Sequence, residues 1–268
     1  MQGIMLLSVV CAIVLAGIGI WYYQQCRGKT SPGKNTQAGG SPLLETSDSL
    51  TPEIRDYLAN LDIPELTAVL AERAGQMVPA LLEDIALFLT HRGLSQRVIA
   101  MLENTNADVR AQAAELLGYI PLPGASEALV LALGDKSESV RLTAASSLIK
   151  LKDLSTVNAL AEALGKPGKL LPARVAEVLL AFGNDAVMPL IDQMMSADIQ
   201  GQALICEVLG QLGDPRALEV LTEILKESSS EKVRAAAAEA LGSILRQNGA
   251  ATLPEALLEA LKDSHWTV

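Results

Sequence analysis

The side chains that most often carry out catalysis are few in this sequence and widely spaced. It has two histidines, His91 and His265, and three cysteines, Cys11, Cys26 and Cys206. None of them forms the His-x-x-x-His, His-Glu or Cys-x-x-Cys spacing that a metal centre or a redox pair requires. Phosphate-loop, dinucleotide and nucleophile-elbow motifs are also absent. The sequence therefore predicts no catalytic, cofactor or metal site, and we expect a protein that is not an enzyme.

One short basic stretch, GKPGK at residues 165–169, loosely resembles a phosphate loop. A phosphate loop follows a strand and opens a helix, so that backbone N–H groups surround the anion. No strand is predicted before this stretch. We therefore interpret it as a basic loop between two helical repeats.

The elements that carry the remaining polar residues recur along the chain. The segment DVRAQAAELLG at 108–118 is echoed by SVRLTAA at 139–145 and KVRAAAAEALG at 232–242. Arg141 lies 31 residues after Arg110, and Arg234 lies 93 residues, three times 31, after Arg141. A period between 20 and 50 residues is typical of stacked supersecondary units rather than of one globular core. Each unit is predicted to be two antiparallel helices joined by a short turn.

Composition supports an all-helical fold. Half of the 268 residues are apolar, yet only eight are aromatic, and Ala and Leu dominate over the β-branched residues that a sheet favours. The net charge is −10. Because nucleic-acid binding depends on cations that displace condensed counterions, we expect no nucleic-acid partner.

The N-terminal residues 1–26 are predicted to be a transmembrane anchor. Residues 4–23 are an uncharged apolar run, and twenty helical residues span about the 30 Å hydrocarbon layer. The cations Arg27, Lys29 and Lys34 follow it, so the positive-inside rule predicts a single-pass membrane protein with a cytoplasmic C-terminal part. The alternative is a signal peptide or the opposite orientation, either of which places the repeats outside the cytoplasm.

The rest of the chain divides into three segments. Residues 27–50 are rich in Gly, Pro and Ser and predict a flexible linker. Residues 51–105 predict divergent helical repeats, with Ser95 as the N-cap of a helix from 96 to 103. Residues 106–268 predict five regular units. The chain stops where another V-R segment would begin, so we expect a last repeat that is incomplete.

The pattern V-R-x-x-A-x-x-x-L-G followed by D-x-A resembles the HEAT-like repeats of phycobilisome bilin lyases. The resemblance implies an α-solenoid whose arginines bond to an aspartate of a neighbouring turn, with Asp135, Asp153, Asp185 and Asp214 as candidate partners. In the fourth unit Gln200 or Gln202 replaces the arginine. A HEAT-repeat di-iron hydroxylase is not indicated, because its His-Glu pairs are missing here. The arginines to which the resemblance gives this structural role between repeats are Arg110, Arg141, Arg174 and Arg234.

In such solenoids the second helix of each pair lines the concave face, and here each of these helices carries acidic residues. An acidic stripe attracts a basic protein surface. We therefore predict a membrane-tethered, non-enzymatic scaffold that binds a basic protein partner. The alternative is a subunit of a bilin-lyase-type enzyme, which would need a pigment-binding groove and a partner subunit. The candidate protein-binding residues are Glu127, Glu162, Asp192, Glu219, Glu223, Glu255 and Glu259.

Overall fold

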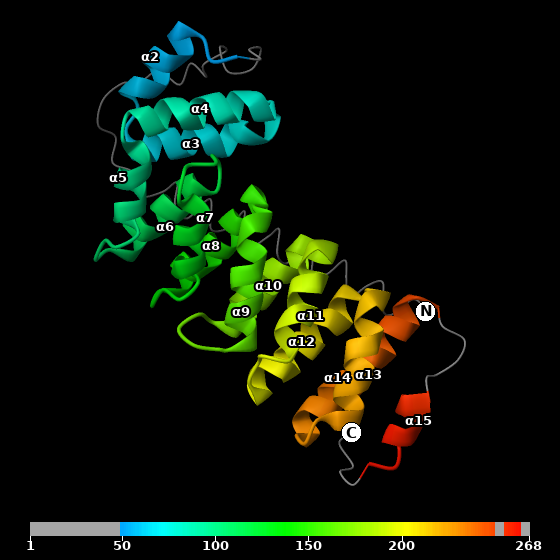
Figure 1. The fold of residues 1–268 in the computed structure, drawn as a ribbon. Helices are drawn as coiled ribbons and strands as arrows, with labels where there is room; N and C mark the ends of the chain where they lie inside the picture. The colour runs from blue at the N-terminus through cyan, green and yellow to red at the C-terminus, as the bar shows by residue number, and fades with distance from the viewer. Residues whose placement is uncertain (1–48, 250–254, 264–268) are drawn as a thin grey trace, which may run out of the picture. The chain divides into compact units, whose positions relative to one another are not determined.

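The computed structural model describes residues 49–249 and 255–263, all of which belong to one compact unit, Pro42–Val268. The predicted anchor at residues 1–26 and nearly all of the predicted linker at residues 27–50 lie outside the described residues. Within the two described ranges every regular element is a helix, which confirms the all-α prediction for this part of the chain (Figure 1). No helix in these ranges is both long and apolar enough to cross a bilayer.

Two of the helices that precede the regular repeats, α2 and α3, begin at a side-chain cap. The Asp62 side chain accepts a hydrogen bond from the Glu65 backbone N–H at 2.8 Å, and the Glu65 side chain accepts one from the Asp62 backbone N–H at 3.0 Å. This reciprocal pair satisfies two N–H groups that a helix start leaves free. The bounds are α2 Pro52–Asn60, α3 Ile63–Arg73, α4 Pro79–His91 and α5 Leu94–Met101.

The predicted N-cap at Ser95 is wrong. Helix α5 begins at Leu94, directly after Gly93, whose φ of 71° turns the chain between α4 and α5. Glycine adopts this left-handed conformation at little cost because it has no Cβ. Ser95 instead lies buried inside the helix, with its hydroxyl 3.1 Å from that of Thr90.

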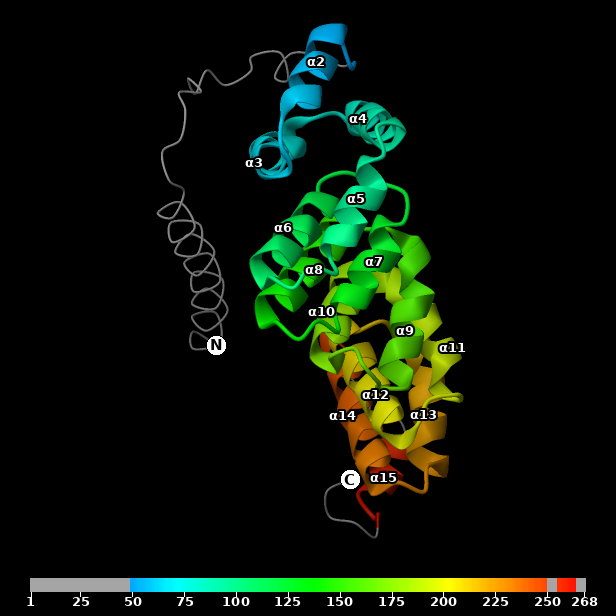
Figure 2. The ribbon, with the colours of Figure 1, turned by 90° about the vertical axis from the view of Figure 1, so that its left-hand side faces the viewer.

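Five helix pairs follow, and we call their members first helices and second helices. Neighbouring first helices pack on one another from α6 to α14, and α7, α9, α11 and α13 lie together on the other side (Figure 2). The first helices are α6 Ala107–Leu117, α8 Glu138–Leu151, α10 Pro172–Phe182, α12 Ile199–Leu212 and α14 Glu231–Gln247. The second helices are α7 Ala125–Ala132, α9 Val157–Gly165, α11 Val187–Met194, α13 Leu218–Glu227 and α15 Glu255–Ala260.

Small residues stand where the first helices come closest. Gly118 at the end of α6 lies against Ser147 of α8, and a Cβ on Gly118 would lie only 2.7 Å from the Ser147 Cα. Gly210 of α12 lies equally close to the Cα of Ala240 in α14. Larger side chains at these points would push the helices apart. The close spacing therefore depends on residues without bulk, and Leu and Val fill the core around them.

One junction between units is made by backbone atoms. The Asp198 N–H donates to the Gly165 carbonyl oxygen at 3.0 Å. A Cβ on Gly201 would overlap the same carbonyl group, so α12 lies directly against the end of α9. Only glycine fits at position 201 without displacing one of these helices.

Candidate functional site

The acidic residues of the second helices form one exposed set. Glu127 on α7, Glu162 on α9, Asp192 on α11 and Glu219 with Glu223 on α13 are all exposed to solvent. Glu255 begins α15, and Glu259 is exposed on the same helix. The structure thus brings acids from neighbouring second helices to the surface, and whether they bind a partner stays a prediction.

Two equivalent positions, one turn apart, recur on four of these helices, and we call the eight residues the second-helix face. All eight side chains are exposed, and none is a lysine or an arginine. They are Glu127 and Leu131 on α7, Asn158 and Glu162 on α9, Met188 and Asp192 on α11, and Glu219 and Glu223 on α13.

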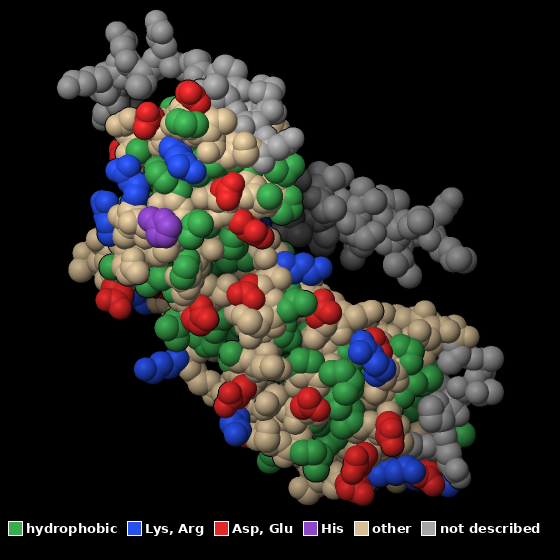
Figure 3. All heavy atoms as spheres, turned by 45° about the horizontal axis from the view of Figure 1, so that its top comes forward, with side chains coloured by type: hydrophobic (Ala, Val, Ile, Leu, Met, Phe, Trp, Pro, Cys, Tyr) green, Lys and Arg blue, Asp and Glu red, His purple; other side chains and the backbone are tan. Residues whose placement is uncertain are grey.

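Apolar residues interrupt the carboxylates of this face. The Leu131 side chain is 75% exposed and that of Met188 is 46% exposed. In the space-filling view, acidic side chains stand separately among hydrophobic ones (Figure 3). The residue pattern missed this feature, because an apolar residue on a Leu-rich helix is ordinarily expected in the core. The face can therefore make apolar contacts and accept hydrogen bonds at the same time.

Arg110 shows how the recurring arginines are held. Its Nε and Nη2 donate to the two carboxylate oxygens of Asp135, both at 2.7 Å. Its Nη1 donates to the carbonyl oxygens of Asn104 at 2.8 Å and Thr105 at 3.1 Å. The Arg110 hydrogen bonds hold the pKa of Asp135 below its usual value, and the Asp135 carboxylate raises the pKa of Arg110. This bidentate ion pair joins α6 to the loop before α8.

Arg234 repeats this arrangement at the other end of the array. Its Nε and Nη2 donate to Asp263 at 2.7 and 2.9 Å, and its Nη1 donates to the Ser228 carbonyl at 2.9 Å. Asp263 follows α15, so the ion pair ties that helix to α14. Sequence reasoning did not name Asp263 as a partner, because the connection between these two helices is longer than in the other units.

No aspartate among the described residues pairs with Arg141 or Arg174 in this way. The Arg141 Nη1 donates to the carbonyl oxygens of Asp135 at 2.8 Å and Lys136 at 3.2 Å, as Arg110 does one unit earlier. Arg174 pairs with Glu177 on its own helix at 2.5 Å. The Nε atoms of both arginines are buried and reach no hydrogen-bond acceptor among the described residues.

Two of the remaining candidate aspartates bond residues other than the recurring arginines. Asp214 bonds the Arg216 side chain at 3.0 and 2.7 Å, and Asp153 accepts from the Ser155 N–H at 3.0 Å. In the fourth unit, where a glutamine replaces the recurring arginine of the first helix, Gln202 donates to the Met194 carbonyl oxygen at 3.2 Å. Local turn geometry thus decides which acid each cation pairs with.

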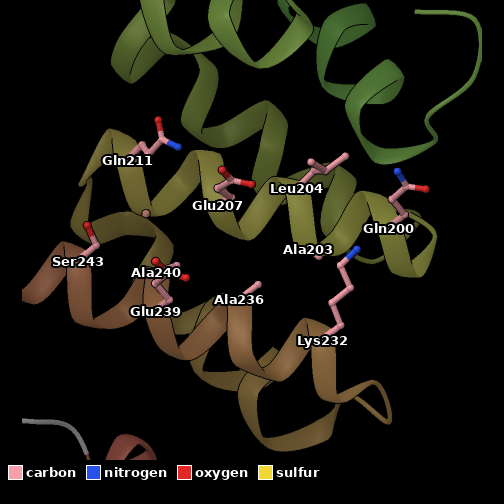
Figure 4. A pocket seen from close by; sticks show the side chains of 11 residues that line it. Gln200, Ala203, Leu204, Glu207, Gln211, Lys232, Ala236, Glu239, Ala240 and Ser243 are labelled. Carbon is pink, nitrogen blue, oxygen red and sulfur yellow. The ribbon is translucent and has the colours of Figure 1, made fainter. Parts of the chain in front are cut away.

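A groove of about 330 Å³ lies between α12 and α14, on the first helices rather than the second (Figure 4). Ala203, Gly210, Ala236 and Ala240 are among the residues that line it, and their small side chains leave the space open. Lys232, Glu239 and Glu207 give it polar walls. Sequence reasoning missed this groove, although the small residues at helical spacing are a signal that could have found it.

The cysteine and the histidine within the described ranges lie on different helices, Cys206 on α12 and His91 on α4. Burial raises the pKa of the Cys206 thiol to about 12, which leaves it protonated and unreactive at neutral pH. His91 is exposed at the end of α4. No group of three or more His, Cys, Asp or Glu side chains among residues 49–249 and 255–263 could hold a metal ion.

Comparison with known proteins connects these repeats to characterised ones. The model of the HEAT-repeat family matches residues 95–181 and 187–268. A phycocyanobilin lyase subunit beta from Nostoc sp. is 28% identical over 146 residues, which cover 52% of this chain and 72% of that protein. The corresponding subunit from Thermosynechococcus vestitus is 30% identical over 108 residues, 40% of this chain and 51% of its own length.

Two solved structures show a low overall likeness. A chain from the complex of CpcE and CpcF of phycocyanin lyase from Nostoc sp. aligns with a TM-score of 0.34 at 20% identity, over 86% of this chain and 98% of that one. Human deoxyhypusine hydroxylase aligns with a TM-score of 0.31 at 21% identity, over 82% and 90%.

These comparisons correct three predictions. A membrane-tethered, non-enzymatic scaffold is wrong, and so is the expectation that the chain has no part in an enzyme, because the matched relatives are lyase subunits. A missing catalytic motif does not exclude a chain that shares its chemistry with a partner. The prediction of a single-pass membrane protein with a cytoplasmic solenoid is corrected by the same relatives. The apolar run at residues 4–23, on which it rested, lies outside the described residues.

Proposed function

The chain belongs to the HEAT-repeat family, and on that premise we propose that it is a subunit of a bilin-lyase-type enzyme that binds a linear tetrapyrrole. The observation that carries the proposal is the similarity to phycocyanobilin lyase subunits over 146 residues. That length spans several repeat units, so the similarity extends beyond one shared repeat motif.

The second-helix face has the chemistry to bind such a pigment. A bilin presents flat apolar rings, pyrrole N–H donors along one edge and propionate carboxylates. Leu131 and Met188 offer exposed apolar contact, and the Glu162 and Asp192 carboxylates beside them are acceptors for N–H groups. Ligand sites commonly combine an apolar surface with a few polar groups that fix orientation.

A partner subunit is part of this proposal. The matched relatives are named as subunits, and the described residues of this chain supply apolar contacts and carboxylates but no nucleophile with an adjacent base. We place the partner on α13, where Glu219 and Glu223 give two exposed acids one turn apart. Opposite charges speed encounter and fix orientation, so the partner surface is expected to be basic.

We assign these roles to the segment 106–268, which holds the five regular units. The divergent helices of 51–105 extend the array at its other end. In this division the pigment lies over α7, α9 and α11, and the partner lies over α13.

The test is to co-express the full chain with a phycocyanobilin supply and to measure visible absorbance of the purified protein. We expect bound pigment with a shifted absorption band. Leu131→Glu should weaken binding about tenfold, because it places a charge in an apolar contact. The matched control is Leu142→Glu, which alters an exposed leucine on the first helix α8 and should bind as the wild type does.

The partner requirement has its own measurement. Glu219→Lys with Glu223→Lys should lower capture of the chain's partner subunit without reducing bound pigment, whereas Glu239→Lys on α14 should change neither. A wild-type chain that takes up no phycocyanobilin, alone or with a lyase partner subunit, would falsify the proposed function.

A further inference from the structure

The second unit has a cation where the first unit has a closed ion pair. Asp135, the partner of Arg110, lies 25 residues after it and directly follows Leu133-Gly134. The residue 25 positions after Arg141 is Lys166 (166 − 141 = 25), which directly follows Leu164-Gly165. The equivalent position therefore carries a positive charge instead of a negative one.

Arg141 is nonetheless oriented as Arg110 is. Both use Nη1 to bond the carbonyl oxygens five and six residues before themselves. The Arg141 Nε therefore lies on the side where, in the first unit, the Arg110 Nε donates to the Asp135 carboxylate. The Arg141 Nε is buried and has no acceptor among the described residues. A buried donor without an acceptor is unfavourable, so the position favours an incoming anion.

Further cations lie on the loop that follows α9. Lys166 and Lys169 are exposed on this loop, and Arg174, which comes at the start of α10, has a second buried Nε without an acceptor. The Lys169 carbonyl oxygen lies against Gly134, where a Cβ would come within 3.0 Å of it. The loop thus lies beside Gly134, which directly precedes Asp135 and Lys136, the residues whose carbonyl groups hold Arg141.

Three acids at this edge are already engaged, and Glu162, four residues before Lys166, is exposed. Asp135 is bonded to Arg110, Glu177 is bonded to Arg174, and the Asp198 side chain accepts from the Gly201 N–H at 2.7 Å. Glu138 is exposed at the start of α8, next in sequence to the loop that carries Lys136. Arg141, Lys166 and Lys169 therefore form a local positive excess on a chain whose net charge is −10.

From this geometry we propose that Arg141, Lys166 and Lys169 bind a carboxylate of the ligand, which on the proposed function is a propionate of the bilin. Guanidinium and carboxylate groups match in shape and form short, charge-assisted hydrogen bonds. Leu131 lies three residues before Gly134, and Glu162 lies four residues before Lys166. The second-helix face and the carboxylate site are thus adjacent, and one bilin can reach both.

The experiment compares phycocyanobilin with its dimethyl ester, whose propionates carry no charge, on the full chain. The wild type should bind the free acid about tenfold more tightly than the ester, the usual effect of one charge-assisted hydrogen bond. Lys166→Asp introduces the acid that the first unit has at the equivalent position. This variant should keep the fold and abolish the preference for the free acid over the ester. Arg141→Gln should abolish it too, and Lys226→Gln on α13 is the control that should retain it.

The outcomes separate this inference from the proposed function. If the wild type binds acid and ester equally, or if Lys166→Asp retains the preference, the carboxylate site is wrong and the bilin-binding function stands. If the wild type binds neither compound, both are wrong. A preference that Lys166→Asp and Arg141→Gln abolish together supports the site, because the first variant adds an ion pair while the second removes a cation.

Discussion

The first and second repeat units orient their arginines alike but surround them differently. Arg110 meets Asp135 and is fully paired, whereas Arg141 keeps the same backbone contacts and faces a position occupied by Lys166. The first helices of the two units pack closely on each other, because Gly118 meets Ser147 and the Lys150 Nζ lies 4.3 Å from the centre of the Tyr119 ring. The ion pair is therefore one of several contacts that hold the helices together. A unit can fold without it, and its arginine then remains available to bind a ligand.

The largest expected effect comes from removing the paired arginine. Arg110→Gln leaves the Asp135 carboxylate without its cation in a half-buried site, and we expect a loss of about 3 kcal/mol in the free energy of unfolding. Arg141→Gln breaks only backbone contacts of an unpaired cation and should cost about 1 kcal/mol or less. Urea-induced unfolding of both variants measures the difference. Equal losses would show that the two arginines hold the fold in the same way.

Acid should weaken the first unit more than the second. Since Arg110 holds the folded-state pKa of Asp135 below its value in the unfolded chain, its contribution is complete above the unfolded pKa, about 4, and is lost as pH falls through the lower folded pKa. Unfolding by urea between neutral pH and pH 2 should show this loss in the wild type. Asp135→Asn should show a smaller acid dependence, and an unchanged one would contradict the assignment.

The smallest expected effect is a gain. Lys166→Asp should give Arg141 the partner that Arg110 has, and the free energy of unfolding should rise by about 0.5 kcal/mol at neutral pH. The gain should shrink at high salt, because the loop is exposed and its charges are screened. Lys169→Asp, three residues along the same loop, is the matched control and should give less. A loss of stability in Lys166→Asp would show that the two units differ in more than this charge.

The sequence predicts the helices better than the contacts between them. The V-R period places the first helices because one buried face must recur in every unit, and Asp62 with Glu65 marks a helix start through local bonds. Ser95 misleads because a serine before an apolar run looks like a cap, while the turn is made by Gly93. The ion pair of Asp263 and the lack of an aspartate partner for Arg141 among the described residues could not be predicted. Both depend on which side chains neighbouring loops bring together.

The candidate site also has features that the sequence predicts and features that it does not. Its acids could be located because they recur at fixed helical positions, whereas the exposure of Leu131 and Met188 could not, since helix periodicity does not show which neighbours cover a residue. The expectation of no enzyme failed for a related reason. Catalytic spacings within one chain say nothing about chemistry shared between two subunits.

The backbone junction between Gly165 and Gly201 has a mechanical consequence. Where side chains meet, neighbouring units can shift by changing rotamers, but here the Gly165 carbonyl group meets α12 with no side chain between them. Helix α9 belongs to the second unit and α12 to the fourth, so the second, third and fourth units should move as one rigid segment, and bending of the array falls to the other junctions. Lys166 follows this junction directly, so its loop is anchored at its first residue and loses less conformational freedom when it binds an anion.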